Sequence, residues 1–437
     1  MNRYYFYMGW RSLRKNPVLT FLMIAAIGFG VSAFMATLAV FRAVSGDPMP
    51  WKSGELFVPQ IDNWGPQSHG PDGEPPDLLS YIDAIALTKL NQNLHQTAIY
   101  PIALPMIPTN AQSLPSSIDG YAVYADFFRM FEVPFRYGGS WMREIDDNHG
   151  SVVVISEKLN QLVFGGKNSV GQQININNKN FQVVGVTSNW NPQPRFYDVA
   201  NANGFKSEPP DFFIPFSSSI DAQVATKGSN NCNGHAGVGW DGWLRSQCAW
   251  VSFWVQLDSA QDVGAYKSMM RNYAEDQHRL GRFNWAPNVR LRNLVEWLDY
   301  QKVAPEESMV SLMIAAAFLV VCLVNTAGLL LAKFMRRAAE IGLRRALGAS
   351  RRDIYRQFLI EASLIGLAGG TLGLFLTWIG MANIDLLFDP DIAKLATMSS
   401  WLVVGTVLVA LITTLLAAFY PIWRAAAVQP AWQLKSN

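Results

Sequence analysis

The stretch that decides the fold is SMVSLMIAAAFLVVCLVNTAGLLLA, residues 308–332, which is followed directly by the basic segment KFMRRAAEIGLRRALGASRRD, residues 333–353. The first stretch contains no Asp, Glu, Lys or Arg. Roughly 20 apolar residues in a helix cross the hydrocarbon core of a bilayer, so this stretch is long enough for a transmembrane helix. A buried core helix of a soluble protein rarely continues so far without a charge, which makes a membrane span the better interpretation.

Three further uncharged stretches occupy residues 16–41, 362–384 and 395–423. They help to explain why only 16% of the 437 residues are charged, below the roughly 25% of an ordinary soluble domain. The 16–41 stretch is longer than the apolar run of about 7–15 residues in a signal peptide, so we expect it to be retained in the protein as a membrane span. The sequence therefore predicts four transmembrane helices, at 16–44, 305–332, 362–384 and 398–423.

Basic residues are unevenly distributed around these four spans. They gather in residues 1–15 and 333–361, whereas the 385–397 loop carries three aspartates and one lysine. Lys and Arg are enriched on the cytoplasmic side of membrane proteins. We therefore expect the 333–361 segment and both termini, including the 424–437 tail, to be cytoplasmic. Residues 45–304 then lie outside the membrane, as in a multi-pass protein of a bacterial inner membrane.

Residues 45–304 have the pattern of a folded domain rather than a linker. Short apolar runs that are typical of strands alternate with helical patterns, which predicts an α+β domain. The 187–249 stretch is rich in Asn, Gly, Pro and Ser and is interpreted as long loops. The expected strands lie at 55–59, 151–155, 172–176, 181–186 and 250–255, and the expected helices at 76–89, 156–164 and 260–278.

Motifs for catalysis, metal binding and cofactor binding are absent from the sequence. The five histidines never pair at metal-ligand spacing, and no G-x-S-x-G motif occurs. Gly165-Gly166-Lys167 lacks the first glycine and the Ser/Thr of a phosphate-binding loop. Gly28-Phe-Gly30 lies within the first span, where helix packing explains it better than a dinucleotide fingerprint. We therefore predict no catalytic residue, metal site or cofactor in this chain, and a net charge of +2 gives no reason to expect nucleic acid.

Glycines recur in the third span at intervals of four residues. Gly366 and Gly370 are four residues apart, as are Gly369 and Gly373. Small residues at this spacing let two membrane helices approach closely, so we predict that these glycines pack against neighbouring helices. A loosely packed glycine-rich helix is the alternative. No ionisable residue lies in a span core, which disfavours a proton or ion relay.

The basic segment after the second span contains residues that typically end one helix and begin another. We expect the helix of that span to continue through about Leu347 and to end at Gly348, which tolerates the left-handed cap. Ser350 then caps a new helix, with Asp353 three residues on. The alternative is simple anchoring by positive charge. Glu340 within the basic run, and the helix–break–helix pattern, favour a shaped docking surface instead.

Several of these stretches form a set in fixed order and spacing: residues 322–351, 361–373 and 420–430. This set resembles the permeases of the MacB/FtsX superfamily of ABC transporters. Residues 11–17 before the first span are similar to the opening of that family. The outer segment is similar to it as well, at residues 138–139, 151–156, 162–165, 169–174, 181–186 and 210–215.

The resemblance implies a large extracytoplasmic domain with a porter-like part (about 45–120 and 246–304) and an inserted subdomain (about 121–245). Such permeases work in pairs with cytoplasmic ABC ATPase subunits, which bind the ATP and magnesium. Because only about 15 residues precede the first span, we expect the ATPase on a separate polypeptide. Closure of the ATPases would move the cytoplasmic helices and, through the spans, the outer domains, a mechanism called mechanotransmission.

The resemblance also implies where the partners bind. A second permease chain is expected, in a homodimer or a heterodimer, and a periplasmic adaptor is a further candidate partner. Residues 1–15, with Tyr4, Tyr5, Tyr7 and Trp10 among the cations, are expected to form an amphipathic helix on the lipid surface. The residues expected at the ATPase contact, with Glu340 orienting neighbouring arginines, are Glu340, Leu343, Arg344, Arg345, Ala346, Leu347, Gly348 and Ala349.

Three functions are compatible with this organisation. The first is the permease subunit of an ATP-driven exporter that handles a substrate outside the membrane. The second is an FtsX-like signal transmitter that controls a partner in the outer compartment without transport. An integral-membrane enzyme is the third, and the absence of catalytic motifs disfavours it.

Two cysteines of the outer segment are expected to form a disulfide. Cys232 and Cys248 lie in the compartment where disulfides persist, and they bound a loop rich in Gly and Asn. Closing a loop of that length contributes roughly 3 kcal/mol in the chain-entropy model. The alternative is two free thiols. Cys322 lies within the second span and behaves as a small apolar residue.

Overall fold

The structure is a computed structural model that divides into two compact units. The helical unit comprises Met1–Ser45 and Ala304–Asn437, and the sheet unit comprises Gly46–Val303. The residues that the structure describes are 14, 16–68, 73–106, 116–202, 205, 208–234, 236–304, 306–383 and 400–427. The predicted surface helix at 1–15 (Arg14 apart), the 385–397 loop and the end of the tail after residue 427 lie outside the described residues.

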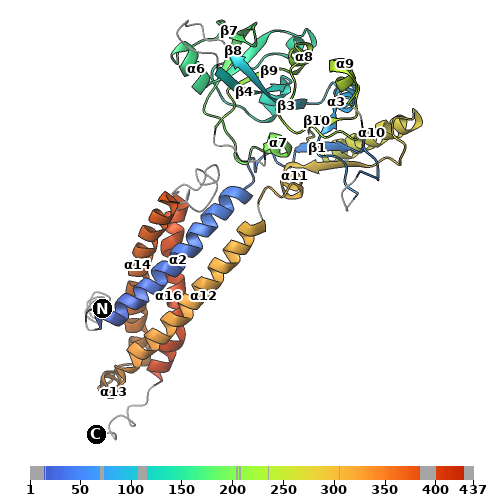
Figure 1. The fold of residues 1–437 in the computed structure, drawn as a ribbon. Helices are drawn as coiled ribbons and strands as arrows, with labels where there is room; N and C mark the ends of the chain where they lie inside the picture. Colours follow the sequence, from blue (N-terminus) through green and yellow to red (C-terminus); the bar gives the residue numbers. More distant parts are fainter. Residues whose placement is uncertain are drawn as a thin grey trace. The chain divides into compact units, whose positions relative to one another are not determined.

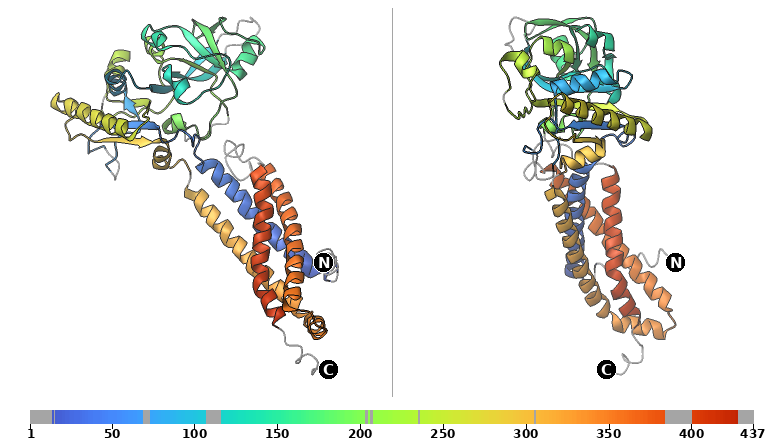
Figure 2. Two further views of the ribbon diagram at one scale, coloured as in Figure 1. Left: turned by 180° about the vertical axis from the view of Figure 1, so that it is seen from behind. Right: turned by 90° about the vertical axis from the view of Figure 1, so that its right-hand side faces the viewer.

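Four long helices form the helical unit (Figure 1). They are α2 (Pro17–Ser45), α12 (Glu306–Met335), α14 (Arg351–Ala382) and α16 (Ser400–Ala426), and each is long and apolar enough to cross a membrane. The helices pack in the cyclic order α2, α14, α16, α12, so that each has two main neighbours (Figures 1 and 2). The predicted fold class, four membrane helices with a large α+β domain, is confirmed.

The expected continuous helix from the second span to Leu347 is wrong. α12 ends at Met335, Arg336 and Arg337 form a turn, and a separate helix α13 spans Ala338–Ala346. The turn lets the Arg337 side chain reach inward to a buried carboxylate of α14, described below.

The end of α13 follows the expected local chemistry. Leu347 is its C-cap, and Gly348 adopts φ 101°, a left-handed conformation that glycine tolerates without strain. Ser350 caps α14, since its hydroxyl accepts from the Asp353 N–H while the Asp353 side chain accepts from the Ser350 N–H. The helix–break–helix shape is therefore encoded locally, although its first helix is shorter than expected.

The sheet unit is built on an 11-stranded sheet with the order β11-β1-β10-β3-β4-β9-β6-β8-β5. Off this path, β2 pairs with β10, and β7 pairs with β3 and β8. The pairs β4–β9 and β6–β8 are parallel, and the others are antiparallel. The strands are β1 (Leu56–Ile61), β2 (Leu79–Ser80), β3 (Gln96–Met106), β4 (Ser116–Val123), β5 (Phe135–Gly138), β6 (Val152–Ser156), β7 (Gln173–Ile176), β8 (Lys179–Thr187), β9 (Phe212–Pro215), β10 (Ala249–Gln256) and β11 (Val289–Asn293).

Strands are expected from the sequence where β1, β6, β7, β8 and β10 occur, and helices where α3, α6 and α10 occur. The 187–249 stretch is not only loops, which corrects the expectation, because it holds β9 and four short helices. β9 forms because its apolar Phe212, Phe213 and Ile214 align in parallel with β4 inside the sheet. The helices of the sheet unit are α3 (Tyr81–Leu90), α4 (Asp126–Met130), α5 (Arg143–Asp147), α6 (Glu157–Phe164), η1 (Phe196–Asp198), α7 (Val199–Ala202), α8 (Phe216–Asp221), α9 (Gly239–Leu244), α10 (Ala260–Arg279) and α11 (Leu294–Tyr300).

Both faces of the sheet are covered by apolar cores. Successive strand side chains point to opposite faces, and in β6 Val152 and Val154 enter one core while Val153 and Ile155 enter the other. The core that holds Val153 also includes side chains of α3 and α10, and the opposite core includes side chains of α4 and α11. This layering fixes α3 on one face of the sheet, where it borders the cavity described below.

Cys232 and Cys248 are joined by a disulfide, with Cα atoms 4.1 Å apart. The neighbouring residues Asn231 and Ala249 also exchange backbone hydrogen bonds. The Gly- and Asn-rich loop is therefore attached at its base to β10, in the arrangement expected from the sequence.

Candidate functional site

A fully buried ion pair lies where α12 and α14 meet near α13. Lys333 Nζ is 2.8 Å from Glu361 Oε1, and both side chains are 0% exposed. The Thr20 hydroxyl of α2 is 3.5 Å from the same Nζ atom. Arg337 Nη1 donates to the second carboxylate oxygen of Glu361 at 3.1 Å. One carboxylate of α14 thus holds two cations that flank the end of α12.

Glu340 of α13 extends this network towards the surface. Its carboxylate accepts from Arg337 Nε at 3.2 Å and pairs with Arg344 Nη2 at 2.7 Å. Arg344 also donates to the Gln357 side chain of α14 at 2.9 Å. Burial opposes the charge of Arg337, but the carboxylates of Glu340 and Glu361 outweigh this effect and raise its pKa.

Arg345 provides the link to the fourth helix. Its Nη1 donates to the backbone carbonyl of Ala426, the last residue of α16, at 3.3 Å. The short helix α13 is therefore attached by polar contacts to α14 and α16, and it follows α12 after a turn of two residues. A displacement of α13 would have to break these contacts or carry the ends of the long helices with it.

The eight residues predicted at the ATPase contact separate into two groups. Glu340, Arg344 and Arg345 face internal partners, as described above. Leu343 and Leu347 are 59% and 80% exposed, while Ile341 on the inner face is 4% exposed. Ala346 and Gly348 are exposed, and Ala349 is half-buried. α13 therefore presents an apolar outer surface, the α13 leucine face, defined by Leu343 and Leu347.

Sequence reasoning missed the Lys333–Glu361 pair. The two residues stand at the ends of uncharged stretches, directly after 308–332 and directly before 362–384. Glu361 is one of few acidic residues in a strongly basic segment, which was the available indication that it pairs internally.

The four glycines predicted to pack do lie at helix–helix contacts. A Cβ built on Gly369 would be 2.7 Å from Ile27 Cγ2 of α2, and one on Gly366 would be 3.0 Å from Thr414 Oγ1 of α16. The corresponding distance is 3.2 Å from Gly370 to Ala410 Cβ and 3.4 Å from Gly373 to the backbone oxygen of Gly28. A side chain would clash at Gly369 and would be tightly packed at Gly366 and Gly370, whereas a Cβ at Gly373 would make ordinary contact.

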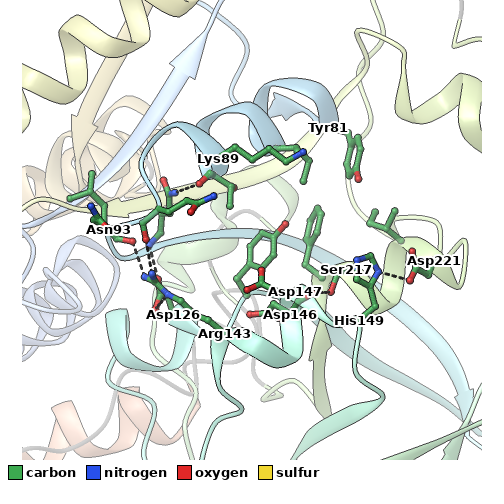
Figure 3. Close-up of a pocket in the computed structure, with 18 residues that line it drawn as sticks. Tyr81, Lys89, Asn93, Asp126, Arg143, Asp146, Asp147, His149, Ser217 and Asp221 are labelled. Atoms are coloured by element: carbon green, nitrogen blue, oxygen red, sulfur yellow. Dashed lines mark hydrogen bonds and ion pairs between the residues drawn. The ribbon is translucent and has the colours of Figure 1, made fainter.

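The sheet unit contains a cavity of about 620 Å³ (Figure 3). Residues of α3, α5 and α8 line it, together with the segment that follows α3 and the segment that follows β4. Its apolar wall consists of Tyr81, Tyr124 and Phe216, whose rings are nearly parallel. The Tyr81 and Phe216 centroids are 6.3 Å apart, and those of Tyr124 and Phe216 are 5.1 Å apart.

Ion pairs close the two ends of this cavity. At one end Arg143 contacts Asp126 and donates to the backbone carbonyls of Gln92 and Leu94 at 2.7 and 2.8 Å. At the other end His149 Nδ1 is 2.5 Å from Asp221 Oδ2. Figure 3 shows the two pairs at opposite ends of the cavity lining. α5 is thereby attached to the segment after α3 and, through His149, to α8.

Asp146 forms the floor of the cavity beneath Tyr124. Its two oxygens accept from the Ala125 N–H at 2.8 Å and from Trp141 Nε1 at 2.9 Å. Burial raises the pKa of this carboxyl to about 7, against the lowering effect of those two donors, and neighbouring Asp147 raises it further. The side chain of Asp147 forms no hydrogen bond or ion pair with any residue that the structure describes, and the same holds for the side chain of Lys89 on α3.

A metal-binding cluster does not occur among the described residues, since no group of three His, Cys, Asp or Glu side chains there could hold an ion. Within the same part of the chain, the cavity carries no pairing of a nucleophile with a base. The cavity presents charged and aromatic side chains.

Comparisons with known proteins match nearly the whole chain. The MacB-like periplasmic core domain matches residues 20–273, and the FtsX-like permease C-terminal domain matches residues 312–430. The chain is 26% identical to the pyoverdine export ATP-binding/permease protein PvdT of Pseudomonas aeruginosa, over 98% of this chain and 58% of the relative. It is also 26% identical to the macrolide export ATP-binding/permease protein MacB of Azoarcus sp., with the same coverage. The chain thus spans about 58% of the length of these relatives.

Among solved structures, the periplasmic region of MacB from Actinobacillus actinomycetemcomitans is similar at 13% identity and a TM-score of 0.34. It covers 58% of this chain and 91% of that one. The extracellular domain of the ABC-type transporter YknZ gives the same TM-score at 11% identity, covering 54% and 100%.

Proposed function

We propose that this chain, which belongs to the family of FtsX-like permeases with a MacB-like periplasmic core domain, is the membrane-spanning subunit of an ATP-driven exporter. A partner ATPase in the cytoplasm binds the ATP and magnesium and docks on α13. The four long helices cross a bacterial inner membrane with both termini in the cytoplasm. The sheet unit lies outside, where it handles the substrate together with a second permease chain and, in the complete assembly, an adaptor.

The polar network around α13 is the observation that carries this proposal. A short helix with an exposed leucine face is bonded by Arg344 to α14 and by Arg345 to α16, and a turn of two residues joins it to α12. A partner that pushed on the leucine face would transfer its displacement to the ends of α12, α14 and α16. This is the linkage that mechanotransmission requires.

Replacing both Leu343 and Leu347 with Asp tests the docking surface. Both side chains are exposed, so the double variant should fold and insert normally. We expect co-purification of an ABC-type ATPase with the chain, detected by mass spectrometry, to fall at least tenfold. The matched control is Leu280→Asp, an exposed leucine of the sheet unit with 77% exposure, which should retain the ATPase. Equal recovery of the ATPase with both variants would overturn the assignment.

A cross-link between α2 and α12 tests the transmission. A Cβ built on Gly30 lies 2.9 Å from Cys322 Cβ, closer than the roughly 3.5–4.5 Å of a disulfide, so Gly30→Cys brings a second thiol to the native one only after α2 and α12 separate slightly. Gly30→Ser, which has the same steric effect without the bond, is the matched control and should keep export. We expect the oxidised variant to keep the ATPase bound but to lose ATP-dependent export, and reduction to restore it. Export that is unchanged in the cross-linked chain would contradict a mechanism in which these helices move against each other.

A further inference from the structure

The cavity of the sheet unit has two unpaired charges of opposite sign on opposite sides. Figure 3 shows Lys89 on α3 along one side and Asp146 and Asp147 on α5 along the other. Both Lys89 and Asp147 are exposed, and neither side chain has a hydrogen-bond or ion-pair partner among the described residues. The other charged side chains that line the cavity, apart from Asp146, form the Arg143–Asp126 and His149–Asp221 pairs.

We propose that this cavity binds a small zwitterion with an apolar, flat body, whose ammonium group lies at Asp147 and whose carboxylate lies at Lys89. Its body stacks on the wall formed by Tyr81, Tyr124 and Phe216. The proposal concerns binding to the sheet unit, and it holds whether or not the chain exports the ligand.

The shape of the cavity suits such a ligand. Its volume of about 620 Å³ falls within the roughly 300–1,000 Å³ of small-molecule sites. Aromatic rings prefer offset-stacked or edge-to-face neighbours, and Tyr81 and Phe216, whose planes differ by 5°, offer such a surface. The hydroxyls of Tyr81 and Tyr124 have no partner among the described residues, so they remain available to polar groups of the ligand.

The charges select a zwitterion over ligands of a single sign. An anion would form a favourable ion pair with Lys89 but would be repelled by Asp147 and by the partly ionised Asp146. A cation would form an ion pair with Asp147 but would leave Lys89 without a partner on the opposite side of the cavity. Solvated single charges are common on surfaces, but these two border one cavity without pairing with each other. A ligand with both charges satisfies both walls at once.

Short aromatic peptides provide probes in which each charge can be removed separately. The full chain in lipid nanodiscs is titrated by calorimetry with phenylalanine, phenylalanyl-leucine and phenylalanyl-leucyl-leucine. Each probe is used free, with an acetylated N-terminus and with an amidated C-terminus. We expect the free form of at least one length to bind, and either blocked form to bind about tenfold more weakly, as expected for the loss of a hydrogen bond to a charged group.

Two variants assign the charges to their partners. In Asp147→Asn the free and the acetylated probe should bind equally, while the preference for a free carboxylate remains. In Lys89→Met the free and the amidated probe should bind equally, while the preference for a free amine remains. Glu275→Gln and Lys267→Met, exposed positions of α10 outside the cavity, are the matched controls and should leave every preference unchanged.

Three results would overturn the proposal: no binding of any free probe, equal binding of free and blocked probes to the unaltered chain, or preferences that persist in both variants. All substituted side chains are exposed, and unchanged thermal unfolding of each variant would show that the fold is retained.

Discussion

Replacing Glu361 with Gln should strongly destabilise the helical unit, because it leaves a buried ammonium group without its counter-charge. Lys333 Nζ lies 2.8 Å from the carboxylate in a fully buried environment. Coulomb's law gives about 6 kcal/mol for unit charges at this distance with an effective dielectric constant of about 20. Desolvation of both ions offsets much of this attraction, so the intact pair adds little net stability.

Removing one partner is different, because the desolvation of the other remains uncompensated. Breaking a buried pair in this way costs about 3–5 kcal/mol. After Glu361→Gln, Lys333 keeps neutral partners, the Thr20 hydroxyl at 3.5 Å and the introduced amide oxygen, but no anionic one among the described residues, whereas Arg337 keeps Glu340. We therefore expect a loss of about 3–5 kcal/mol in Glu361→Gln, and a loss at least 2 kcal/mol smaller when Lys333→Met is combined with it.

The assay is chemical unfolding of the detergent-solubilised chain, followed for both single variants and the double variant. Glu340→Gln is the matched control, since that carboxylate is 35% exposed and partly exposed pairs contribute about 0–1 kcal/mol. Strictly additive losses in the double variant, or a loss below 1 kcal/mol in Glu361→Gln, would refute the assignment of a coupled buried pair.

Three further predictions concern other parts of the chain. Gly369→Leu should lower the unfolding free energy by about 1–3 kcal/mol through overpacking, because its Cβ would lie 2.7 Å from a side-chain carbon of α2; Gly380→Leu, which meets nothing within 4 Å, should change it little in the same assay. Reduction of the Cys232–Cys248 disulfide should lower the stability of the sheet unit by about 2–4 kcal/mol. The unfolding temperature should therefore fall when reductant is added to the unaltered chain, and it should not change with reductant in the Cys→Ser double variant. The raised pKa of Asp146, about 7, means that the folded state binds a proton that the unfolded state releases near pH 4; unfolding free energy should therefore fall between pH 4 and pH 7, and this fall should shrink in Asp146→Asn.

Sequence reasoning succeeded where the physical constraint is local. An uncharged stretch long enough for a bilayer identifies a span without knowledge of its neighbours. Ser350 and Asp353 make a helix start visible from residues three positions apart. The strand at Val152–Ser156 was recognisable because both faces of the sheet bury it, which gives a continuous apolar run.

The longest strand, β3, was not predictable by these rules. It contains Pro101 and Pro105, and prolines argue against a central strand because they cannot donate a ladder hydrogen bond. The pairing explains how they are tolerated. β10 covers β3 only from Gln96 to Ile99, so beyond that point β3 pairs along one side with β4, while the other side meets β7 only at Met106. The prolines therefore lie where one side of the strand has little to pair with.

The candidate sites were only partly predictable for a related reason. α13 could be located because its basic residues and terminal glycine are contiguous in sequence. The Lys333–Glu361 pair depends on the packing of two helices, and the cavity depends on three short helices between residues 81 and 221. No spacing rule connects Lys89 to Asp147, since their relation arises only when α3 and α5 border the same cavity.

The proposed mechanical transmission would use the two covalent connections between the units. α2 ends at Ser45, where the sheet unit begins, and the sheet unit ends at Val303, just before α12. Within the sheet unit, the first and last strands are neighbours, with Phe57 opposite Asn293. Within the helical unit, α2 and α12 pack side by side. The two segments that join the units are therefore neighbours within each unit, with β1 and β11 paired in one and α2 and α12 packed in the other. In the proposed mechanism, a movement that begins at α13 reaches α12 through the two-residue turn and through Glu361, which pairs with both Arg337 and Lys333, and α12 is covalently joined to the sheet unit that carries the cavity.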